Sequence, residues 1–388
     1  MEIHFHQAIK EIPEPSWQSL AVDDYPFLQY QFLLTLEESG CVSDETGWYP
    51  QHVLLKSDDG EILAFMPLYI KTHSSGEYVF DWSWADAYRQ NSLRYYPKLL
   101  TAIPFTPATG PRLLLAADAN LDDVYGVLLQ GIHQRAEALN ISSWHLLFPN
   151  DAHLAALQSL QNANQQSVLG FRMGCQYHWL NRDYQDFDHF LASFRSPKRK
   201  NVKKERMRVA AQGLTLHHLE GHEITPEIWT TFYRFYANTY WVRGREPYLN
   251  ETFFQLLGQR LAEHLVMVLA QKDNQYVAGA LCFKSQTTLY GRYWGCEQEF
   301  DMLHFEACYY QGIDYCIAHQ LKRFDPGAQG QHKIPRGFNP TATWSSHWIE
   351  HPQFRHAVND FCQREAVEMQ SYIEDAQTRL PFKRVESE

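Results

Sequence analysis

Apolar residues recur along the chain with two different periods, and the period changes many times between the termini. Spacings of three and four residues place apolar side chains on one face of a helix and predict the longer helices. These are expected at residues 26–39, 121–139, 153–161, 226–240, 251–263, 303–319 and 352–378. Short alternating or continuous apolar runs predict strands. They are expected at residues 52–56, 61–71, 112–116, 143–148, 172–180 and 214–219.

Three further strands follow in series within residues 264–295, where HLVMVLAQ, YVAGALCFKS and TLYGRYWG are separated by short polar turns. Such spacing predicts an antiparallel meander. The meander leads into the predicted helix 303–319, a short strand and a glycine-punctuated loop, which is the order of a βαβ unit. Ligands collect beyond the carboxyl ends of the strands in such units. We therefore expect substrate-binding side chains there: Arg292, Trp294, His332, Lys333 and Arg336.

The predicted helix 303–319 has one apolar stripe and a polar start. Phe305, Tyr309, Ile313 and Cys316 are spaced by four, four and three residues, which predicts that they face the sheet. Asp301 stands where an N-cap is expected, so the positive end of the helix dipole would point toward His304. A helix end of this kind suits an anion or a developing oxyanion.

An acidic and aromatic strip lies within VFDWSWADAYRQ. One interpretation is a twisted strand end with its tryptophan rings in the core. The other is a surface that binds a sugar or an amine through stacking and charge-assisted hydrogen bonds. Ionised carboxylates are rarely buried without a partner, which favours a binding role for the aspartates. The substrate-binding candidates of this strip are Asp81, Trp82, Trp84 and Asp86.

A basic run occupies the middle of the chain, with seven Lys or Arg among the eleven residues 198–208. Val202 and Val209 form a narrow apolar seam, so the run is expected as a helix over residues 196–212 that ends near Gly213. The basic residues then cover its other faces. They form either a solvated surface or a local contact to a polyphosphate or nucleic acid, with Lys200, Lys203 and Lys204 as candidates for phosphate binding.

Composition limits the remaining possibilities. A net charge of -11 argues against nonspecific binding of nucleic acid or membrane over the whole surface. Seven cysteines without a C-x-x-C pair indicate neither a zinc site nor a disulfide framework, and no metal site is predicted among the 19 histidines. No signal peptide or membrane span is recognised, so a cytoplasmic protein is expected. H-E-x-x-H, P-loop, Rossmann and G-x-S-x-G patterns are missing from the sequence.

The meander, helix and strand together resemble the acyltransferase fold of the GNAT superfamily. SPKRKNVKKERMRVAAQGLTL resembles the basic helix of the Fem aminoacyltransferases, which join two GNAT-like domains. FDWSWADAY, YYPKLLTAIPFTPATGPRLL, LHFEACYYQGIDYCIAH and GAQGQHKIPRGFNP look like signatures of a Fem-related bacterial branch of predicted N-acyltransferases, or peptidoglycan biosynthesis proteins.

The resemblance implies an α+β fold with two GNAT-like domains in tandem, whose mixed, largely antiparallel sheets are flanked by helices. The domains are expected at residues 1–165 and 166–388. It also implies transfer of an acyl or aminoacyl group from a tRNA- or CoA-linked donor to an amine, such as that of a cell-wall precursor. The donor would be a co-substrate, with no tightly bound cofactor. The loop CEQEFDMLHFE departs from the family pattern because it lacks the glycines that cradle the pyrophosphate of CoA.

Acyl transfer to an amine requires a base, a stabilised oxyanion and a protonated leaving group. His304, Glu306 and His332 are the catalytic candidates, while Arg292, Lys333 and Arg336 would hold phosphates or carboxylates. Structural alternatives exist, since Glu306 can pair with a neighbouring arginine and His304 can cap the helix. A noncatalytic protein that binds a cell-wall precursor, an acyl ligand or a protein partner is the alternative function.

Overall fold

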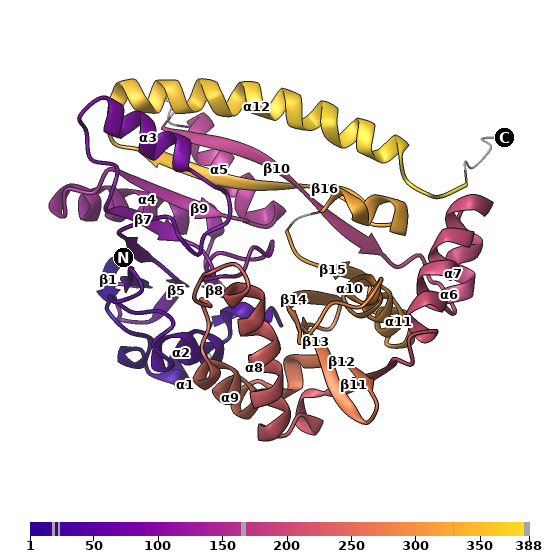
Figure 1. Ribbon diagram of the computed structural model, residues 1–388. Helices are drawn as coiled ribbons and strands as arrows, with labels where there is room; N and C mark the ends of the chain where they lie inside the picture. The colour runs from indigo at the N-terminus through magenta and orange to yellow at the C-terminus, as the bar shows by residue number, and fades with distance from the viewer. Residues whose placement is uncertain (18–19, 22–23, 164–167, 329, 384–388) are drawn as a thin grey trace. The chain divides into compact units, whose positions relative to one another are not determined.

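Helices and strands alternate along the chain and assemble into two units (Figure 1). The structure, a computed structural model, describes residues 1–17, 20–21, 24–163, 168–328 and 330–383. Unit 1 comprises residues 1–174 and 342–371, and unit 2 comprises residues 175–341 and the chain from residue 372 onward. The domain boundary predicted between residues 165 and 166 lies outside the described residues and stays a prediction.

Unit 1 contains two groups of paired strands. The first has the order β1-β4-β5-β8-β2 and is antiparallel throughout: β1 (Glu2–His6), β2 (Leu20–Ala21), β4 (His52–Lys56), β5 (Ile62–Met66) and β8 (Leu114–Ala116). In the second group, the end of β16 pairs with β9, and β7, β6 and β3 follow in that order. The pair of β7 with β9 is parallel, and the other pairs are antiparallel. Its strands are β3 (Trp48–Pro50), β6 (Tyr69–Lys71), β7 (Lys98–Thr101), β9 (Ser143–Leu147) and β16 (Asn339–Ile349).

Helices of unit 1 pack their apolar faces against these strands. The longest helix that lies entirely within the described part of the unit, α4, begins with the side chain of Asn120 accepting hydrogen bonds from the backbone of Asp122 and Asp123. Its buried residues Tyr125, Leu128 and Ile132 share one core with Trp144 of β9. The helices are α1 (Glu14–Trp17), α2 (Tyr30–Glu38), α3 (Trp82–Gln90), α4 (Leu121–Ala138), α5 (Asp151–Ala163) and the first part of α12 (Pro352–Thr378).

The sheet of unit 2 has the strand order β11-β12-β13-β14-β15-β10. The predicted meander is confirmed, since β12, β13 and β14 pair antiparallel in series. β14 then pairs parallel with β15, as a βαβ unit requires. The strands are β10 (Leu169–Leu180), β11 (Thr215–Glu220), β12 (Leu265–Lys272), β13 (Gln275–Lys284), β14 (Thr288–Cys296) and β15 (Arg323–Asp325).

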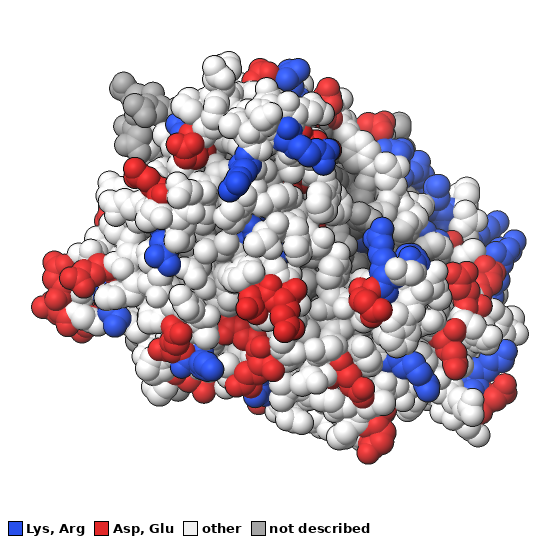
Figure 2. Space-filling view, turned by 60° about the vertical axis from the view of Figure 1, so that its left-hand side comes forward, with Lys and Arg blue, Asp and Glu red and all other residues white. Residues whose placement is uncertain are grey.

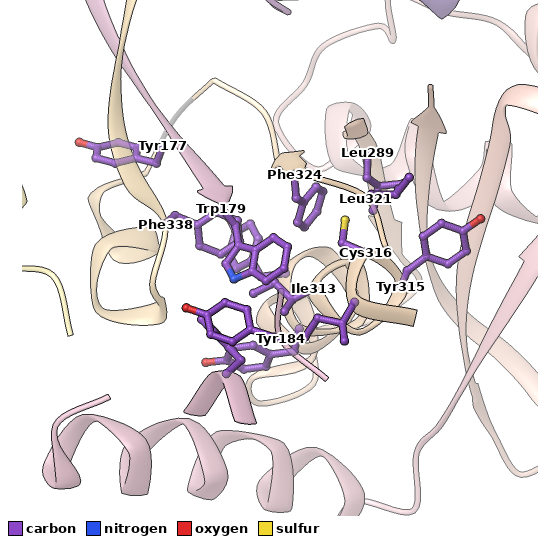
Figure 3. Close-up of a cluster of buried hydrophobic side chains, with 14 of the residues drawn as sticks. Tyr177, Trp179, Tyr184, Leu289, Ile313, Tyr315, Cys316, Leu321, Phe324 and Phe338 are labelled. Atoms are coloured by element: carbon purple, nitrogen blue, oxygen red, sulfur yellow. The ribbon is translucent and has the colours of Figure 1, made fainter. Parts of the chain in front are cut away.

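Aromatic side chains form the core of unit 2. Figure 3 shows Trp179 of β10, Phe324 of β15 and Phe338 gathered beside Ile313 of the helix between β14 and β15. The helices are α6 (Phe187–Ala192), α7 (Ser196–Ala210), α8 (Pro226–Trp241), α9 (Glu251–Arg260), α10 (Leu303–Phe305) and α11 (Gln311–Ala318). In Figure 1, α8 lies beside β14, where a Cβ on Gly295 would come within 2.1 Å of the Phe235 backbone.

Two local predictions are wrong. The strip at 81–90 is a helix, α3, and not a twisted strand end, because Trp84 and Tyr88 are spaced by four residues and both are buried. Asp301 is not an N-cap: Met302 precedes α10, with φ 61° and no side-chain cap. The predicted helix 303–319 is interrupted by a π-helical turn at Glu306–Tyr310.

The predicted α+β class, with mixed and largely antiparallel sheets flanked by helices, is confirmed. Most predicted elements are found within a few residues of their expected bounds, and Pro67 separates β5 from β6 as a proline in a strand pattern predicts. None of the helices that the described residues form has an apolar stretch long enough to cross a membrane.

Candidate functional site

Two of the three catalytic candidates lie together in unit 2. The rings of His304 and His332 are 6.4 Å apart between centroids. His304 comes from α10 and contacts the rings of Trp294 and Tyr309, each at 5.4 Å. The Tyr309 hydroxyl lies 2.8 Å from Nε2 of His332. We call His304, His332, Tyr309 and Trp294 the histidine cluster.

Local backbone geometry places the histidine cluster. His332 belongs to a short 3₁₀ helix, Gln331–Arg336, that follows β15. Tyr309 belongs to the π-helical turn, which adds one residue to a helical turn and shifts the side chains after it. Turns of this kind are frequent at functional sites. The structure thus gathers side chains from β14, the helix after it and the loop after β15, where ligands of a βαβ unit are expected.

Burial favours the neutral form of both histidines. It lowers the pKa of His304 to about 4, with the positive charges of Lys333 and Arg336 and the neighbouring His332 acting in the same direction. Burial, Lys333 and Arg336 also lower the pKa of His332. A neutral imidazole has a lone pair that can accept a proton. No hydrogen bond to the His304 ring is found among the described residues, so its nitrogens are available to a substrate.

Glu306, the third catalytic candidate, is buried in an ion-pair cluster. Its Oε1 accepts hydrogen bonds from Arg206 at 2.9 Å and from Gln311 at 2.7 Å. Arg206 also donates to Asp314 at 2.8 Å and lies over the Phe187 ring. This is the pairing with a neighbouring arginine that the sequence allowed as an alternative. The role of Glu306 in proton transfer stays a prediction.

Arg336 and Lys333 are buried beside the histidine cluster. Arg336 donates to both carboxylate oxygens of Glu205, at 3.0 and 2.8 Å, and stacks on the Phe305 ring at 3.6 Å. Lys333 donates to the carbonyl of Gly327 at 2.5 Å. Burial lowers the pKa of Lys333 to about 8, against the opposing effect of Asp325. Both cations lie near the cluster, but each is engaged inside the protein.

Arg292 is also engaged within unit 2. Its guanidinium meets Asp325 at 2.7 Å, and both side chains are only 2% exposed. Burial alone would raise the pKa of the Asp325 carboxyl, but Arg292 and His178 hold that pKa below its usual value. Asp325 also accepts a hydrogen bond from the backbone of Gly327, at 3.0 Å. The pair therefore fixes the start of the loop that carries His332.

The basic helix α7 has two chemically different faces. Val202 and Val209 are buried, as predicted from their spacing. Glu205 and Arg206 point into the ion pairs of the histidine-cluster region. Lys200, Lys203 and Lys204 are exposed, and Lys203 pairs with Asp188 at 2.8 Å. In the face of the molecule that Figure 2 shows, acidic side chains form clusters at the left and in the lower middle, whereas several lysines and arginines gather toward the right-hand edge.

The remaining substrate-binding candidates lie in unit 1. Asp81 is buried and accepts hydrogen bonds from Lys98 at 2.5 Å and from Tyr95 at 2.6 Å. Burial alone would raise its pKa, but Lys98 and His145 keep the pKa below its usual value. Trp84 is buried, whereas Trp82 is 46% exposed. Asp86 is exposed and pairs with Arg89 on the same helix at 2.8 Å.

Sequence reasoning missed the polar network around Asp81. Lys98 also donates to Glu77 at 2.7 Å, and Tyr95 lies 3.1 Å from Nε2 of His145. Nδ1 of His145 is in turn 2.7 Å from Nδ1 of His347. Lysine within a continuous apolar run, as in YYPKLLTAI, is the one signal that could have indicated a buried partner for Asp81.

Glu205, Arg206 and Tyr309 were missed in unit 2. The first two stand within a basic run that looks solvent-exposed, and the third was assigned only to the apolar stripe. Their partners are far away in the sequence: Glu205 is 131 residues from Arg336, and Arg206 is 100 residues from Glu306. Tyr309 is 23 residues from His332. The residue pattern within a single helix does not indicate which distant residues its side chains will pair with.

The FemAB_like family model, described as peptidoglycan biosynthesis/recognition, matches residues 8–384. The chain belongs to this family. A search of the curated proteins finds no matching sequence. Among solved structures, a crystal structure of FemX is similar, with a TM-score of 0.52 and 15% identity over 92% of this chain and 100% of that chain.

Two other solved structures are similar to this FemAB_like chain. The C-terminal domain of an Agrobacterium fabrum protein, described as a lysylphosphatidylglycerol synthetase, has a TM-score of 0.52 and 10% identity over 93% of this chain and 97% of that chain. A conserved protein from Bacteroides thetaiotaomicron has a TM-score of 0.51 and 11% identity over 90% and 100%. At these identities the likeness establishes the fold, and the expected GNAT-like fold of the Fem proteins is confirmed.

Proposed function

We propose that the protein is an N-acyltransferase that moves an acyl or aminoacyl group from a tRNA- or CoA-linked donor to an amine of a cell-wall precursor. The observation that carries the proposal is the FemAB_like match over residues 8–384, which includes the whole histidine cluster. The neutral imidazole of His304 has a lone pair that can accept a proton, although a pKa of about 4 makes it a weak base, and the neighbouring buried positive charge suits a developing oxyanion.

In the proposed reaction, His304 accepts the proton of the attacking amine. The amine nitrogen forms a bond to the donor carbonyl carbon, and the oxyanion collapses with loss of the ribose oxygen or the thiol sulfur. The proton that His304 accepted then passes to that leaving atom. His332 is oriented by its contact with the Tyr309 hydroxyl at 2.8 Å, and it can hold the amine or share the proton.

Positioning would supply much of the rate, because an activated ester or thioester is intrinsically reactive. The buried cations Lys333 and Arg336 add positive potential beside the cluster, although their hydrogen bonds go to Gly327 and Glu205. We propose that the exposed Lys200 and Lys204, with Lys203, attract the phosphates of the donor. Trp82 and Asp86, exposed on α3, remain candidates for the acceptor.

A noncatalytic binding role is the second candidate. It is favoured by the internal engagement of Glu306, Arg292 and Arg336, each of which bonds to another side chain of the protein. A chain that recognises a cell-wall precursor without acylating it needs the fold and a ligand surface but no base. The two functions differ in whether a product forms.

A transfer assay separates them. The purified protein is incubated with tRNA charged with a labelled amino acid, or with labelled acetyl-CoA, together with peptidoglycan precursors that carry a free amine. Label that moves to the precursor supports the transferase. Saturable binding of the precursor without any labelled product, for both donor classes, would contradict it and support the binding protein.

A further inference from the structure

Three large aromatic side chains are exposed within five consecutive residues of unit 1. Tyr78, Phe80 and Trp82 have exposed fractions of 37%, 49% and 46%, and the rings of Tyr78 and Phe80 lie 5.6 Å apart between centroids. We call these three residues the aromatic ridge. Aromatic side chains contribute most to stability when they are covered. A group of three that stays exposed therefore indicates a surface that contacts a ligand or a partner.

Buried ion pairs fix the segment that carries the aromatic ridge. Nζ of Lys98 donates to Glu77 at 2.7 Å and to Asp81 at 2.5 Å, and these three side chains are no more than 4% exposed. The carbonyl of Phe80 accepts a hydrogen bond from Arg172 at 2.8 Å. The backbone that presents the exposed rings is thus held at both ends and near its middle.

This segment is also strained. Val79, between Tyr78 and Phe80, has a φ of 72°, a conformation that β-branched residues rarely adopt. Such a conformation is destabilising in itself and persists only where surrounding contacts hold it, which here are the bonds made by Lys98 and Arg172. Strained backbone that is held in this way is frequent at ligand-binding sites. Strain and exposed rings at one place indicate that the aromatic ridge has a binding role.

The size of the aromatic ridge favours a small ligand. A large aromatic side chain covers roughly 200 Å² when it is buried, so the exposed fractions of the three residues leave about 260 Å² of aromatic surface. A stable protein–protein interface covers about 800 Å² on each partner. The aromatic ridge supplies about a third of that area, and it therefore suits a small molecule better than a protein partner.

The charges around the aromatic ridge favour a neutral ligand. Residues 78–80 carry no charge, and the carboxylates that flank them are buried and paired. Asp86 lies about one helical turn after Trp82 on α3, and it pairs with Arg89 at 2.8 Å, so their two charges cancel. This exposed pair places hydrogen-bond acceptors and donors on the helix beside the Trp82 ring.

We propose that the aromatic ridge binds the ring of a neutral sugar. The C–H face of a sugar ring is apolar and packs on the electron-rich faces of exposed aromatic rings. Sugar hydroxyls both donate and accept, so they can bond to the carboxylate of Asp86 and to the guanidinium of Arg89. The inference rests on the proposed function in one respect: Trp82 and Asp86 are candidates for the acceptor, and the aromatic ridge assigns that acceptor a sugar portion.

Saturation-transfer NMR and calorimetry on the full chain test the inference. The probes are N-acetylglucosamine and its β-1,4-linked dimer, and uridine is the comparison that stacks through a base. At least one of the sugars should bind the native chain, and it should bind more tightly than uridine. Phe80→Ala and Trp82→Ala each remove one ring, and each should weaken sugar binding about three- to tenfold.

Trp241→Ala is the matched control, because Trp241 is 48% exposed and belongs to unit 2. Sugar binding should be unchanged in this variant, and thermal unfolding confirms that all three variants are folded. The proposal is overturned if neither sugar binds the native chain, if uridine binds more tightly than both sugars, or if Phe80→Ala and Trp82→Ala both bind the sugars as the native chain does.

The binding assay needs neither an acyl donor nor a reaction, so it separates this inference from the proposed function. Sugar binding by a chain that transfers no acyl group would contradict the transferase alone. Acyl transfer to an amine by a chain that binds neither sugar would contradict the role of the aromatic ridge alone.

Discussion

Single residues in the interior of unit 2 carry charges that the fold must keep paired. Arg292 and Asp325 are nearly inaccessible to solvent and meet at 2.7 Å. Removing one member of a buried pair leaves the other charge without a partner in a medium of low dielectric constant, which is much more costly than losing the pair on the surface. The loop that carries His332 begins at this pair, so the geometry of the histidine cluster depends on it.

We therefore expect Asp325→Ala to lower the free energy of unfolding by about 3–5 kcal/mol. The exposed pair of Arg364 and Asp360, at 2.9 Å on α12, is the control. Asp360→Ala should cost less than about 1 kcal/mol, because water screens both charges. Urea unfolding at pH 7 measures both values. Equal losses for the two variants would contradict the structural role given to Arg292 and Asp325.

His153 provides a pH-dependent contribution to the stability of unit 1. Burial, with Arg112 nearby, lowers its pKa from 6.5 to about 4, and its Nδ1 lies 2.7 Å from the Tyr125 hydroxyl. Between pH 6.5 and 4 the unfolded chain binds a proton at this residue that the folded chain does not. The contribution is therefore complete above pH 6.5 and is lost as the pH falls toward 4.

The prediction is that His153→Gln reduces the slope of unfolding free energy against pH in this window. One proton corresponds to about 1.4 kcal/mol per pH unit. Denaturant unfolding at intervals from pH 7 to pH 4 gives the slopes of the native chain and of His153→Gln. If the free energy of unfolding of His153→Gln depended on pH as steeply as that of the native chain, His153 would bind its proton equally in the folded and unfolded chain, which would contradict the prediction.

At the scale of elements, α7 combines a buried seam, an ion-pairing face and an exposed basic face. Glu205 and Arg206 hold it to the helix and loop of the histidine cluster, while Lys200 and Lys204 stay exposed. Binding of a polyanion through exposed lysines releases counterions and weakens as salt increases. Only the exposed face is available for such binding.

We expect Lys200→Glu with Lys204→Glu to reduce tRNA binding at low salt and to flatten its salt dependence. Filter binding at several salt concentrations measures both quantities. Lys10→Glu with Arg94→Glu, at two exposed cations of unit 1, makes the same change in net charge and is the control. If the double variant and the control changed tRNA binding equally, the lysines of α7 would be part of the solvated surface and not of a tRNA-binding site.

Two glycines show how closely elements approach. Gly126 lies within α4, where an added Cβ would meet the Leu160 side chain at an ordinary 3.7 Å. Gly295 lies on β14, where it would meet the backbone of Phe235 in α8 at 2.1 Å. Gly126→Ala should stabilise the protein by about 0.5–1 kcal/mol through helix propensity. Gly295→Ala should destabilise it by more than about 1 kcal/mol, because α8 must move. Urea unfolding distinguishes the two signs, and equal signs would contradict the packing of α8 on β14.

Elements with a strong internal pattern were predictable from the sequence. The meander and the helix after it are examples, because their apolar period and their turns are local. The helix α3 was not, because WSWADAY carries the residues of a strand as well as of a helix and only burial of Trp84 and Tyr88 decides between them. The cap at Asp301 failed because the chain enters α10 through a left-handed residue, Met302.

At the scale of the whole molecule, the family and the α+β fold follow from the sequence, whereas the internal partners of charged residues do not. His304 and His332 were predicted to share a site and are neighbours in the structure. The sequence also predicted site roles for three charged residues of the same segment, Arg292, Arg336 and Glu306. In the structure each of them is hydrogen-bonded to another side chain of the protein. A residue type suggests chemistry, but only packing decides whether the group is left for a substrate.

The central claim is that a FemAB_like chain transfers an acyl group with His304 as the base. Its most direct test is kcat/KM for transfer to an amine by the native protein, His304→Ala and the control His356→Ala, with thermal unfolding as the check of fold. We predict that His304→Ala loses about 10²–10⁴-fold at an unchanged unfolding temperature and that His356→Ala keeps the native value. Native activity in a folded His304→Ala protein would contradict the claim.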